Sequence, residues 1–197
     1  SQVSKTDFHL AKLDTDFHQN WTFSGNIDAS MDYVTHSYDG RYVHLLFSRF
    51  KSNAYAIFRI DLSNGKYEKY QIYSVDRMEI SNFRVLNKSV FIGGIINSQP
   101  MVLYTNLSQK STRILPSVVK GQSEIQSMDI DTTQKLVNIT YSSGNKPKNY
   151  QLIVRSFDEA GNQYNQIVME PNDEFAMMNA KSNQLNDSLQ VVVGTYG

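Results

Sequence analysis

A repeat with a period of 47 residues restricts the fold of this sequence more than any other feature. Three runs of β-branched and aromatic residues mark it, and each run follows a short polar turn. The equivalent positions Val43, Val90 and Val137 lie 47 residues apart, and a fourth run at 189–193 begins 52 residues after Val137. A fixed spacing of this length indicates one supersecondary unit that is copied along the chain.

Each copy contains four strand patterns. A short apolar segment precedes the marker run, and two segments joined by an Asx or Gly turn follow it, as in a β-hairpin. Three copies are complete, while the N-terminus supplies the last two strands of a copy and the C-terminus the first two. The predicted segments are a half unit at 1–28, complete units at 30–73, 78–118 and 124–169, and a half unit at 174–197.

Tandem four-stranded antiparallel units of this length are typical of the blades of a β-propeller. We therefore predict an all-β chain with three complete blades and a half blade at each end, forming over 1–197 a single domain or a fragment of one. A β-sandwich of similar strand number is the alternative, and the regular spacing disfavours it. Alternation in the second strand of each blade predicts these buried residues: Val43, Leu45, Phe47, Val90, Ile92, Val137 and Ile139.

The two half blades are complementary and leave two arrangements open. Pairing of 189–193 with 8–13 would complete a fourth blade and close a small ring. Without that pairing the chain would be an arc of a larger propeller, and the abrupt end inside a strand at 191–197 favours the arc. The start of the sequence has neither an initiator Met nor a signal peptide, which indicates a processed product or an excerpt of a longer chain.

The resemblance to known propellers is generic. The Gly-His and Trp-Asp dipeptides of WD40 repeats are absent, and the Gly-Gly of kelch repeats is matched once, at Gly93-Gly94. The N-terminal hairpin, DFHLAKLD at 7–14 followed by Trp21, resembles blades of exported Bacteroidota proteins, although Asp16-Phe17 stands where those blades have a turn glycine. This resemblance implies a bacterial protein that is periplasmic, associated with the outer membrane or extracellular.

Charge and composition exclude several function classes. Lys and Arg together number 19, as do Asp and Glu, and this balance argues against a protein that binds nucleic acid by neutralising phosphates. Cysteine is absent, which excludes disulfides, thiolate metal ligands and cysteine nucleophiles. No segment approaches the roughly 18 apolar residues of a membrane-spanning helix.

The polar residues form no established catalytic or metal-binding motif. His36, which we place at the end of an inner strand, could reach the axial face of a propeller. Asp129 and Asp131 alternate along one strand, so their side chains point the same way, and we expect both to be solvated. The aspartates at equivalent hairpin turns, namely Asp14, Asp61 and Asp158, are expected to cap backbone amides rather than to bind calcium.

Aromatic residues on predicted outer strands are the remaining candidates. Trp21, Tyr67, Tyr70 and Tyr73 could stack on sugars or form an interface, and packing against the next blade is the alternative. Two short basic segments, at 110–113 and 146–148, are expected to be solvated hairpin residues.

The sequence therefore predicts a non-catalytic binding or scaffolding propeller of the bacterial cell envelope, without a cofactor or metal, that engages a protein or glycan partner. It is expected to belong to a larger complex or a longer chain. The alternative is the propeller portion of a larger exported enzyme, such as a peptidase or glycosidase, with catalytic residues elsewhere. The candidate contact residues are His36, Asp129, Asp131, Trp21, Tyr67 and Tyr70.

Overall fold

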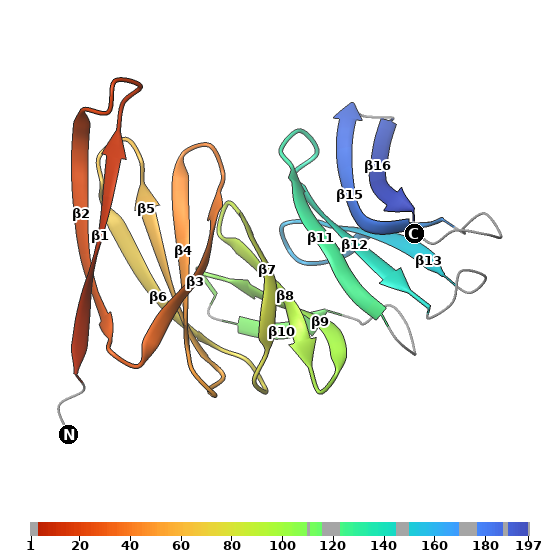
Figure 1. Ribbon diagram of the computed structural model, residues 1–197, viewed down its shortest axis with the longest axis horizontal. Helices are drawn as coiled ribbons and strands as arrows, with labels where there is room; N and C mark the ends of the chain where they lie inside the picture. The colour runs from red at the N-terminus through yellow and green to blue at the C-terminus, as the bar shows by residue number, and fades with distance from the viewer. Residues whose placement is uncertain are drawn as a thin grey trace. The chain divides into compact units, whose positions relative to one another are not determined.

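The computed structural model describes residues 4–109, 111–115, 123–144, 150–169, 177–186 and 189–196, which form strands and turns and no helix (Figure 1). By contacts between Cα atoms, the chain divides into two compact units, Ser1–Arg77 and Met78–Gly197. No helix in the described part of the chain has the length and apolar character that crossing a membrane requires.

The first unit contains a hairpin and a four-stranded sheet. β1 and β2 pair antiparallel as a two-stranded sheet, and β3 to β6 form an antiparallel sheet in which chain neighbours pair. The strands are β1 (Lys5–Leu13), β2 (Gln19–Asp28), β3 (Met31–Tyr38), β4 (Tyr42–Arg49), β5 (Ala54–Asp61) and β6 (Tyr67–Tyr73).

The second unit contains two four-stranded antiparallel sheets and a strand pair. One sheet comprises β7 (Glu79–Leu86), β8 (Ser89–Ile96), β9 (Gln99–Asn106) and β10 (Ser111–Leu115). The other comprises β11 (Ser123–Asp131), β12 (Leu136–Ser143), β13 (Gln151–Phe157) and β14 (Gln163–Met169). The two-stranded sheet comprises β15 (Met177–Asn186) and β16 (Leu189–Tyr196). The predicted all-β class and the four-stranded antiparallel organisation are thus confirmed.

Burial follows the strand position within each sheet. Six of the seven predicted core residues of the second strands are buried, and Val43 is half-buried. The alternation that predicted them is nevertheless incomplete, because the intervening residues Leu46, Phe91 and Asn138 are buried as well. Both faces of these central strands are covered, which is why their sequences read as nearly continuous apolar runs. β6 and β14 are mostly exposed, as expected for outermost strands.

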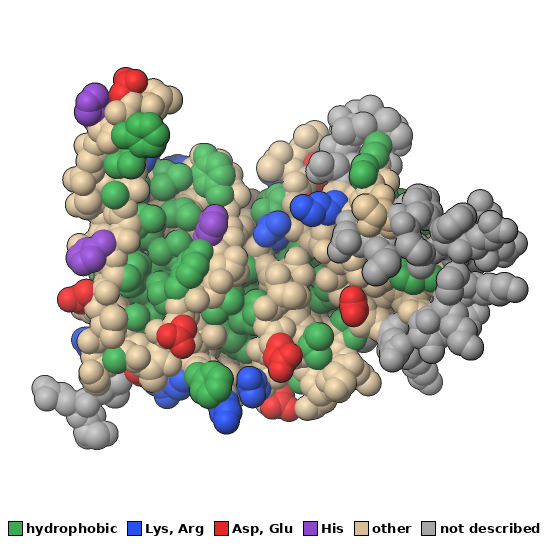
Figure 2. All heavy atoms as spheres, in the orientation of Figure 1, with side chains coloured by type: hydrophobic (Ala, Val, Ile, Leu, Met, Phe, Trp, Pro, Cys, Tyr) green, Lys and Arg blue, Asp and Glu red, His purple; other side chains and the backbone are tan. Residues whose placement is uncertain are grey.

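The core of the first unit lies between the β1–β2 hairpin and the β3–β6 sheet, where hydrophobic side chains fill the space (Figure 2). Phe8 reaches from the hairpin into a group of rings, with its centroid 5.5 Å from that of Phe23, 4.9 Å from that of Phe47 and 4.9 Å from that of Phe58. Such ring pairs contribute roughly 0.5–1.5 kcal/mol each beyond the burial of their area. This cluster fixes the hairpin against the sheet.

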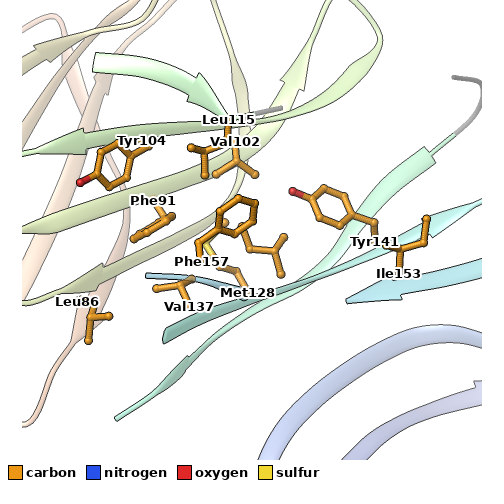
Figure 3. Close-up of a cluster of buried hydrophobic side chains, with 11 residues drawn as sticks. Leu86, Phe91, Val102, Tyr104, Leu115, Met128, Val137, Tyr141, Ile153 and Phe157 are labelled. Atoms are coloured by element: carbon orange, nitrogen blue, oxygen red, sulfur yellow. The ribbon is translucent and has the colours of Figure 1, made fainter. Parts of the chain in front are cut away.

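The core of the second unit joins its two four-stranded sheets (Figure 3). Phe91 on β8 lies 5.3 Å from the ring of Tyr104 on β9 and 6.5 Å from that of Phe157 on β13. Met128 and Val137 complete the contact from β11 and β12, and both are fully buried. Burying side chains of this size stabilises the fold by roughly 1.5–3 kcal/mol each.

The first strand of each four-stranded sheet carries a β-bulge. The registers shift between Tyr33 and Thr35 in β3, between Ile80 and Asn82 in β7, and between Ile125 and Ser127 in β11. On β8, a Cβ on Gly94 would lie 2.2 Å from the carbonyl oxygen of Glu79, and one on Gly93 would lie 3.1 Å from Met128 of β11. The Gly-Gly pair therefore fits the close packing around this strand.

Candidate functional site

The first and third turns of a four-stranded meander lie at the same end of the sheet, because strand direction alternates. In the β7–β10 sheet this end carries the Asn87-Lys88 turn and the turn after Asn106. The turn between β13 and β14, at 158–162, contacts it through side-chain hydrogen bonds. Turns from three parts of the sequence thus meet at one place.

A groove of about 690 Å³ opens between these turns. Most of the residues that line it carry an amide, hydroxyl or charged side chain. The lining residues are Asn87, Lys88, Ser89, Tyr104, Asn106, Ser108, Gln109, Arg113, Glu159, Ala160 and Asn162. We refer to it as the turn groove.

Carbonyl groups of the 158–162 turn hold the turn groove in shape. The Tyr104 hydroxyl donates to the carbonyl of Glu159 at 2.8 Å, and the Ser89 hydroxyl donates to the same oxygen. The Arg113 guanidinium donates to the carbonyl of Ala160 at 2.6 Å. Gly161, with φ of +71°, lies so close that a Cβ would be 2.9 Å from the Tyr104 ring. The walls of the groove are therefore preorganised.

Some side chains of the lining already have hydrogen-bond partners, and others have none among the described residues. The Asn87 amide donates to a Glu159 carboxylate oxygen, and Asn106 accepts from the Ser108 amide at 2.9 Å. Among the described residues, the ammonium group of Lys88 and the side-chain amide of Gln109 make no ion pair or hydrogen bond. The groove thus offers free donors beside groups that are already fixed.

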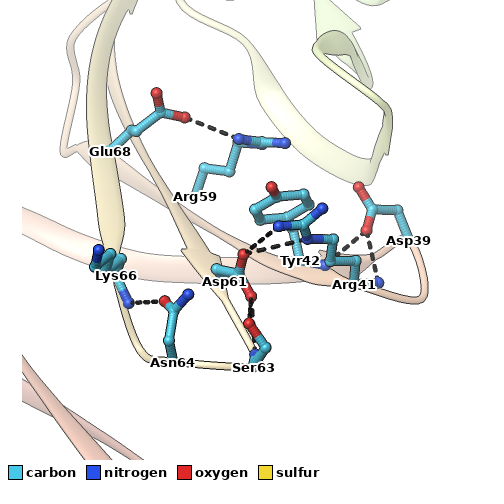
Figure 4. Close-up of polar contacts among 9 residues, drawn as sticks. All are labelled: Asp39, Arg41, Tyr42, Arg59, Asp61, Ser63, Asn64, Lys66 and Glu68. Atoms are coloured by element: carbon cyan, nitrogen blue, oxygen red, sulfur yellow. Dashed lines mark hydrogen bonds and ion pairs between the residues drawn. The ribbon is translucent and has the colours of Figure 1, made fainter.

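The same end of the β3–β6 sheet is occupied by its own charges (Figure 4). Arg41 donates to Asp61 at 2.9 Å, and the Ser63 hydroxyl and amide donate to the other oxygen of Asp61. These bonds, those of Ser63 first, lower the pKa of Asp61 to about 2. Arg59 lies 3.4 Å over the Tyr42 ring and forms an ion pair with Glu68 at 2.9 Å, which also places a charged pair at this end.

Strand pairing fixes which residues of the two ends are equivalent. Tyr42 pairs with Asp61 as Ser89 pairs with Asn106, and Arg59 pairs with Glu68 as Tyr104 pairs with Arg113. The equivalent positions are therefore Arg41 and Lys88, Tyr42 and Ser89, Arg59 and Tyr104, Asp61 and Asn106, and Glu68 and Arg113. An amide thus replaces the central carboxylate in the turn groove.

The first unit holds four of the six predicted contact residues. His36 is exposed on β3, with its Nδ1 2.8 Å from the Tyr33 hydroxyl. The prediction that the inner strand ends at His36 is wrong, since β3 continues to Tyr38. No hydrogen bond or ring contact among the described residues joins His36 to Trp21, Tyr67 or Tyr70.

Trp21, predicted as a residue that could stack on a sugar, is half-buried. Its Nε1 donates to the carbonyl of Leu62 at 3.0 Å, and the Lys12 ammonium donates to the same oxygen at 3.0 Å. Its ring lies against Gly65, whose added Cβ would be 3.5 Å away. An indole N–H needs a partner once it is buried, and this carbonyl provides it.

Tyr67 and Tyr70 lie on β6. Tyr67 is 51% exposed, and its ring packs 4.6 Å from that of Phe23. Tyr70 is half-buried, and burial followed by the nearby Glu68 raises its pKa. Tyr67 therefore packs against the core of the first unit while about half of its surface stays exposed.

Asp129 and Asp131 lie on β11 in the second unit and are less solvated than expected. A carboxylate oxygen of Asp129 lies 3.9 Å from the Arg84 guanidinium. Asp131 is buried, and one of its oxygens accepts the amides of Thr133 and Gln134 at 2.9 Å each. Asp131 thus caps the β11–β12 turn.

The aspartates of the third turns cap backbone amides, as the sequence predicted. Asp14 accepts from the amide of His18 at 2.8 Å, Asp61 from that of Ser63 at 2.8 Å, and Asp158 from that of Asn162 at 2.8 Å. In the turn between β1 and β2, potential metal-ligating atoms of Asp14, Asp16 and His18 lie within 4.8 Å of one another, and all three residues are exposed.

Sequence reasoning missed the turn groove. Its residues come from turns that are identifiable in the sequence, at 87–88, 106–109 and 158–162. The sequence did not indicate that these turns lie together. Their common location follows from strand direction once each strand is assigned to its sheet. Arg113, expected to be solvated, instead stacks 5.1 Å from the Tyr104 ring and holds the neighbouring turn.

Comparison with known proteins identifies the fold. No family model and no curated protein matches the sequence. Among solved structures, the chain is similar to a subtype N10 neuraminidase-like protein of A/little yellow-shouldered bat/Guatemala/060/2010, with a TM-score of 0.50 and 8% identity over 82% of this chain and 50% of that one. It is also similar to TolB from Acinetobacter baumannii, with a TM-score of 0.45 and 16% identity over 93% of this chain and 46% of that one.

Both of these structures are β-propellers. The first likeness, together with the repeated four-stranded antiparallel sheets, shows that this chain has the β-propeller fold that its repeat predicted. The chain spans about half the length of the structures that it matches.

Proposed function

We propose that this protein is a non-catalytic binding propeller that holds a glycan in the turn groove. The observation that carries the proposal is the contrast between the two turn ends. At the end of β3–β6, Arg41 and Arg59 form ion pairs with Asp61 and Glu68, whereas at the end of β7–β10 the side chains of Lys88 and Gln109 have no ion pair or hydrogen bond among the described residues, in a preorganised groove of about 690 Å³.

The chemistry of the lining favours a saccharide over other ligands. Pockets for typical small organic ligands are mostly apolar, and the energetic centre of a protein interface is an apolar or aromatic patch. The described side chains that line the turn groove are mostly polar, and the one aromatic side chain among them, that of Tyr104, is buried. Amides, hydroxyls and charged donors at fixed positions match the many hydroxyl groups of a sugar.

Rigid walls support binding without chemistry. A preformed site loses little conformational entropy when it takes up a ligand, which favours affinity. Among the described residues the groove contains one carboxylate, that of Glu159, and its oxygen already accepts from Asn87. Glycoside hydrolysis ordinarily uses two carboxylates on either side of the bond that breaks.

We place this function in the bacterial cell envelope, in the periplasm, at the outer membrane or outside the cell. The absence of cysteine is compatible with that location, and the resemblance of the N-terminal hairpin to exported blades supports it. The alternative, a propeller portion of a larger exported enzyme, has no specific observation in its favour among the described residues.

A glycan array probed with the purified chain tests the proposal. We expect retention on at least one class of oligosaccharide and no release of reducing ends from it. The double variant Ser108→Ala/Gln109→Ala removes two lining groups and should weaken binding by about tenfold, since each neutral hydrogen bond contributes about 0.5–1.5 kcal/mol.

The matched control is Thr132→Ala/Thr133→Ala, which alters two adjacent exposed residues on the β11–β12 turn outside the groove. Its affinity should equal that of the unmodified chain. Absence of binding across the array, or equal loss in both double variants, would contradict the proposal.

A further inference from the structure

The charge balance of the turn groove differs from that of its counterpart in the first unit. At the end of β3–β6, the cation Arg41 meets the carboxylate of Asp61, which the sheet itself supplies. At the end of β7–β10, the equivalent cation is Lys88 and the equivalent of Asp61 is Asn106. The cation is kept while its internal anion is lost.

The remaining charges of the groove do not restore this balance. Arg113 is directed to the carbonyl of Ala160, so it is fixed without being neutralised. Among the described residues, Glu159 is the one carboxylate of the lining, and its contact is the amide of Asn87. No ion pair with Lys88 occurs within 4.0 Å among the described residues. The described residues of the lining thus carry two cations and one anion.

From this we propose that the glycan in the turn groove carries a negatively charged substituent, and that Lys88 binds this group. The inference rests on the proposed glycan-binding function and specifies the ligand class. The ligand's anion takes the role beside Lys88 that the Asp61 carboxylate has beside Arg41. A carboxylate of a uronic acid and a sulfate ester share the required chemistry.

The local structure allows an internal anion to be restored while the turn cap is kept, at the loss of the 3.4 Å hydrogen bond from Asn106 Nδ2 to the Ser89 hydroxyl. Asn106 keeps the capping role of Asp61, because its Oδ1 accepts the amide of Ser108 as Asp61 accepts that of Ser63. The variant Asn106→Asp therefore restores the internal anion and leaves the turn capped. It tests the charge of the site without removing Lys88.

The experiment is isothermal titration of the full chain with three probes: a neutral maltooligosaccharide, a galacturonate oligosaccharide and a heparin-derived oligosaccharide. We expect the galacturonate or the heparin probe, or both, to bind at least about tenfold more tightly than the neutral one, and this preference to shrink as salt is raised. The difference between the two anionic probes identifies whether a carboxylate or a sulfate is the preferred group.

Variants assign the effect to Lys88. Lys88→Gln and Asn106→Asp should each reduce affinity for the anionic probe by about tenfold, and Lys88→Arg should retain it. The matched control is Lys135→Gln, which removes the same charge from the residue that precedes β12 and lies outside the groove. Thermal midpoints of all variants establish that they are folded.

The outcomes separate the two proposals. Equal affinity for neutral and anionic probes, or an anionic preference that survives Lys88→Gln, overturns the inference and leaves the proposed glycan-binding function standing. Absence of binding to all three probes and across the glycan array overturns both.

Discussion

The turn ends of the β3–β6 and β7–β10 sheets share a backbone and differ in where their counter-charges come from. In the first, Arg41 forms an ion pair with Asp61, and Arg59 forms one with Glu68. In the second, Asn106 and Tyr104 replace Asp61 and Arg59, and Lys88 forms no ion pair with a carboxylate of the described residues. On our proposal, the difference teaches that exchanging a few charged residues on an equivalent turn converts an end that pairs its arginines internally into a binding site.

The two sheets also differ in the strands next to these turns, and this difference gives the largest change in stability that we expect. His44 on β4 and Phe91 on β8 are equivalent, and both have 0% exposure. Burial first, and the Arg59 charge as well, lower the pKa of His44 to about 4, against the opposing effect of Asp39. An ionisable ring thus stands where the second sheet has an apolar one.

The His44 ring makes the first unit sensitive to acid. The folded-state pKa of about 4 lies below the ordinary value of 6.5, so the unfolded chain binds the proton more readily. Stability is fully present above pH 6.5 and falls as the pH drops toward 4, by about 3 kcal/mol in total. His44→Leu should remove this loss, as measured by urea unfolding at pH 7 and pH 4. A variant that loses as much stability as the parent between these pH values would contradict the assignment.

Gly161 and Gly65 provide the second comparison. They have nearly the same φ, +71° and +72°, but a Cβ would lie 2.9 Å from Tyr104 in the first case and 3.5 Å from Trp21 in the second. Gly161→Ala should cost about 2–4 kcal/mol, because strain and overlap add, whereas Gly65→Ala should cost about 1 kcal/mol from strain alone. Equal changes in the free energy of unfolding would show that the 158–162 turn is not held as closely as described.

Phe17 occupies the position of Gly161 in the equivalent turn of the β1–β2 hairpin. Asp14 caps that turn as Asp158 caps the other, yet Phe17 has φ of +62° and is 82% exposed. Because a left-handed aromatic residue is strained and this one buries little, Phe17→Gly should stabilise the chain by about 1 kcal/mol. Chemical denaturation measures this effect, and a destabilised variant would refute the equivalence of the two turns.

The smallest effect is expected from removing the carboxylate of Asp61 at the β3–β6 turn end. Asp61→Asn gives this end the amide that Asn106 provides in the other. Since the pKa of Asp61 is lowered from 3.8 to about 2, its ion pair and hydrogen bonds stabilise the fold above pH 3.8, and this contribution is lost as the pH falls through 2. The variant should show a flatter acid unfolding curve over that range, while an unchanged curve would count against the described network.

Strand order could be predicted from the sequence because it depends on local signals. Runs such as 89–93 are bounded by turn residues, and their spacing repeats along the chain. The bulges in β3, β7 and β11 have no such signal, since they arise from pairing with the next strand. The partial burial of Trp21 likewise depends on the carbonyl of Leu62, 41 residues away in sequence.

The turn groove could not be predicted from the sequence for the same reason, because it depends on contacts between residues that are far apart in the chain. Its contacts join Ser89 and Tyr104 to Glu159, residues 70 and 55 positions apart. The sequence identified each of these turns, and their meeting depends on how the β7–β10 and β11–β14 sheets pack through Phe91 and Phe157. The predicted contact residues, chosen strand by strand, therefore fell outside the groove.

The central claim is that one turn end is a binding site and the equivalent end is not. A titration of the isotope-labelled chain with the galacturonate and heparin-derived oligosaccharides, followed by amide NMR shifts, tests it most directly. We expect shift changes at 87–89, 106–109 and 159–162, and none at 39–42 or 61–66. Changes at the β3–β6 end of equal size, or saturable binding that leaves 87–89 and 159–162 unchanged, would contradict the account.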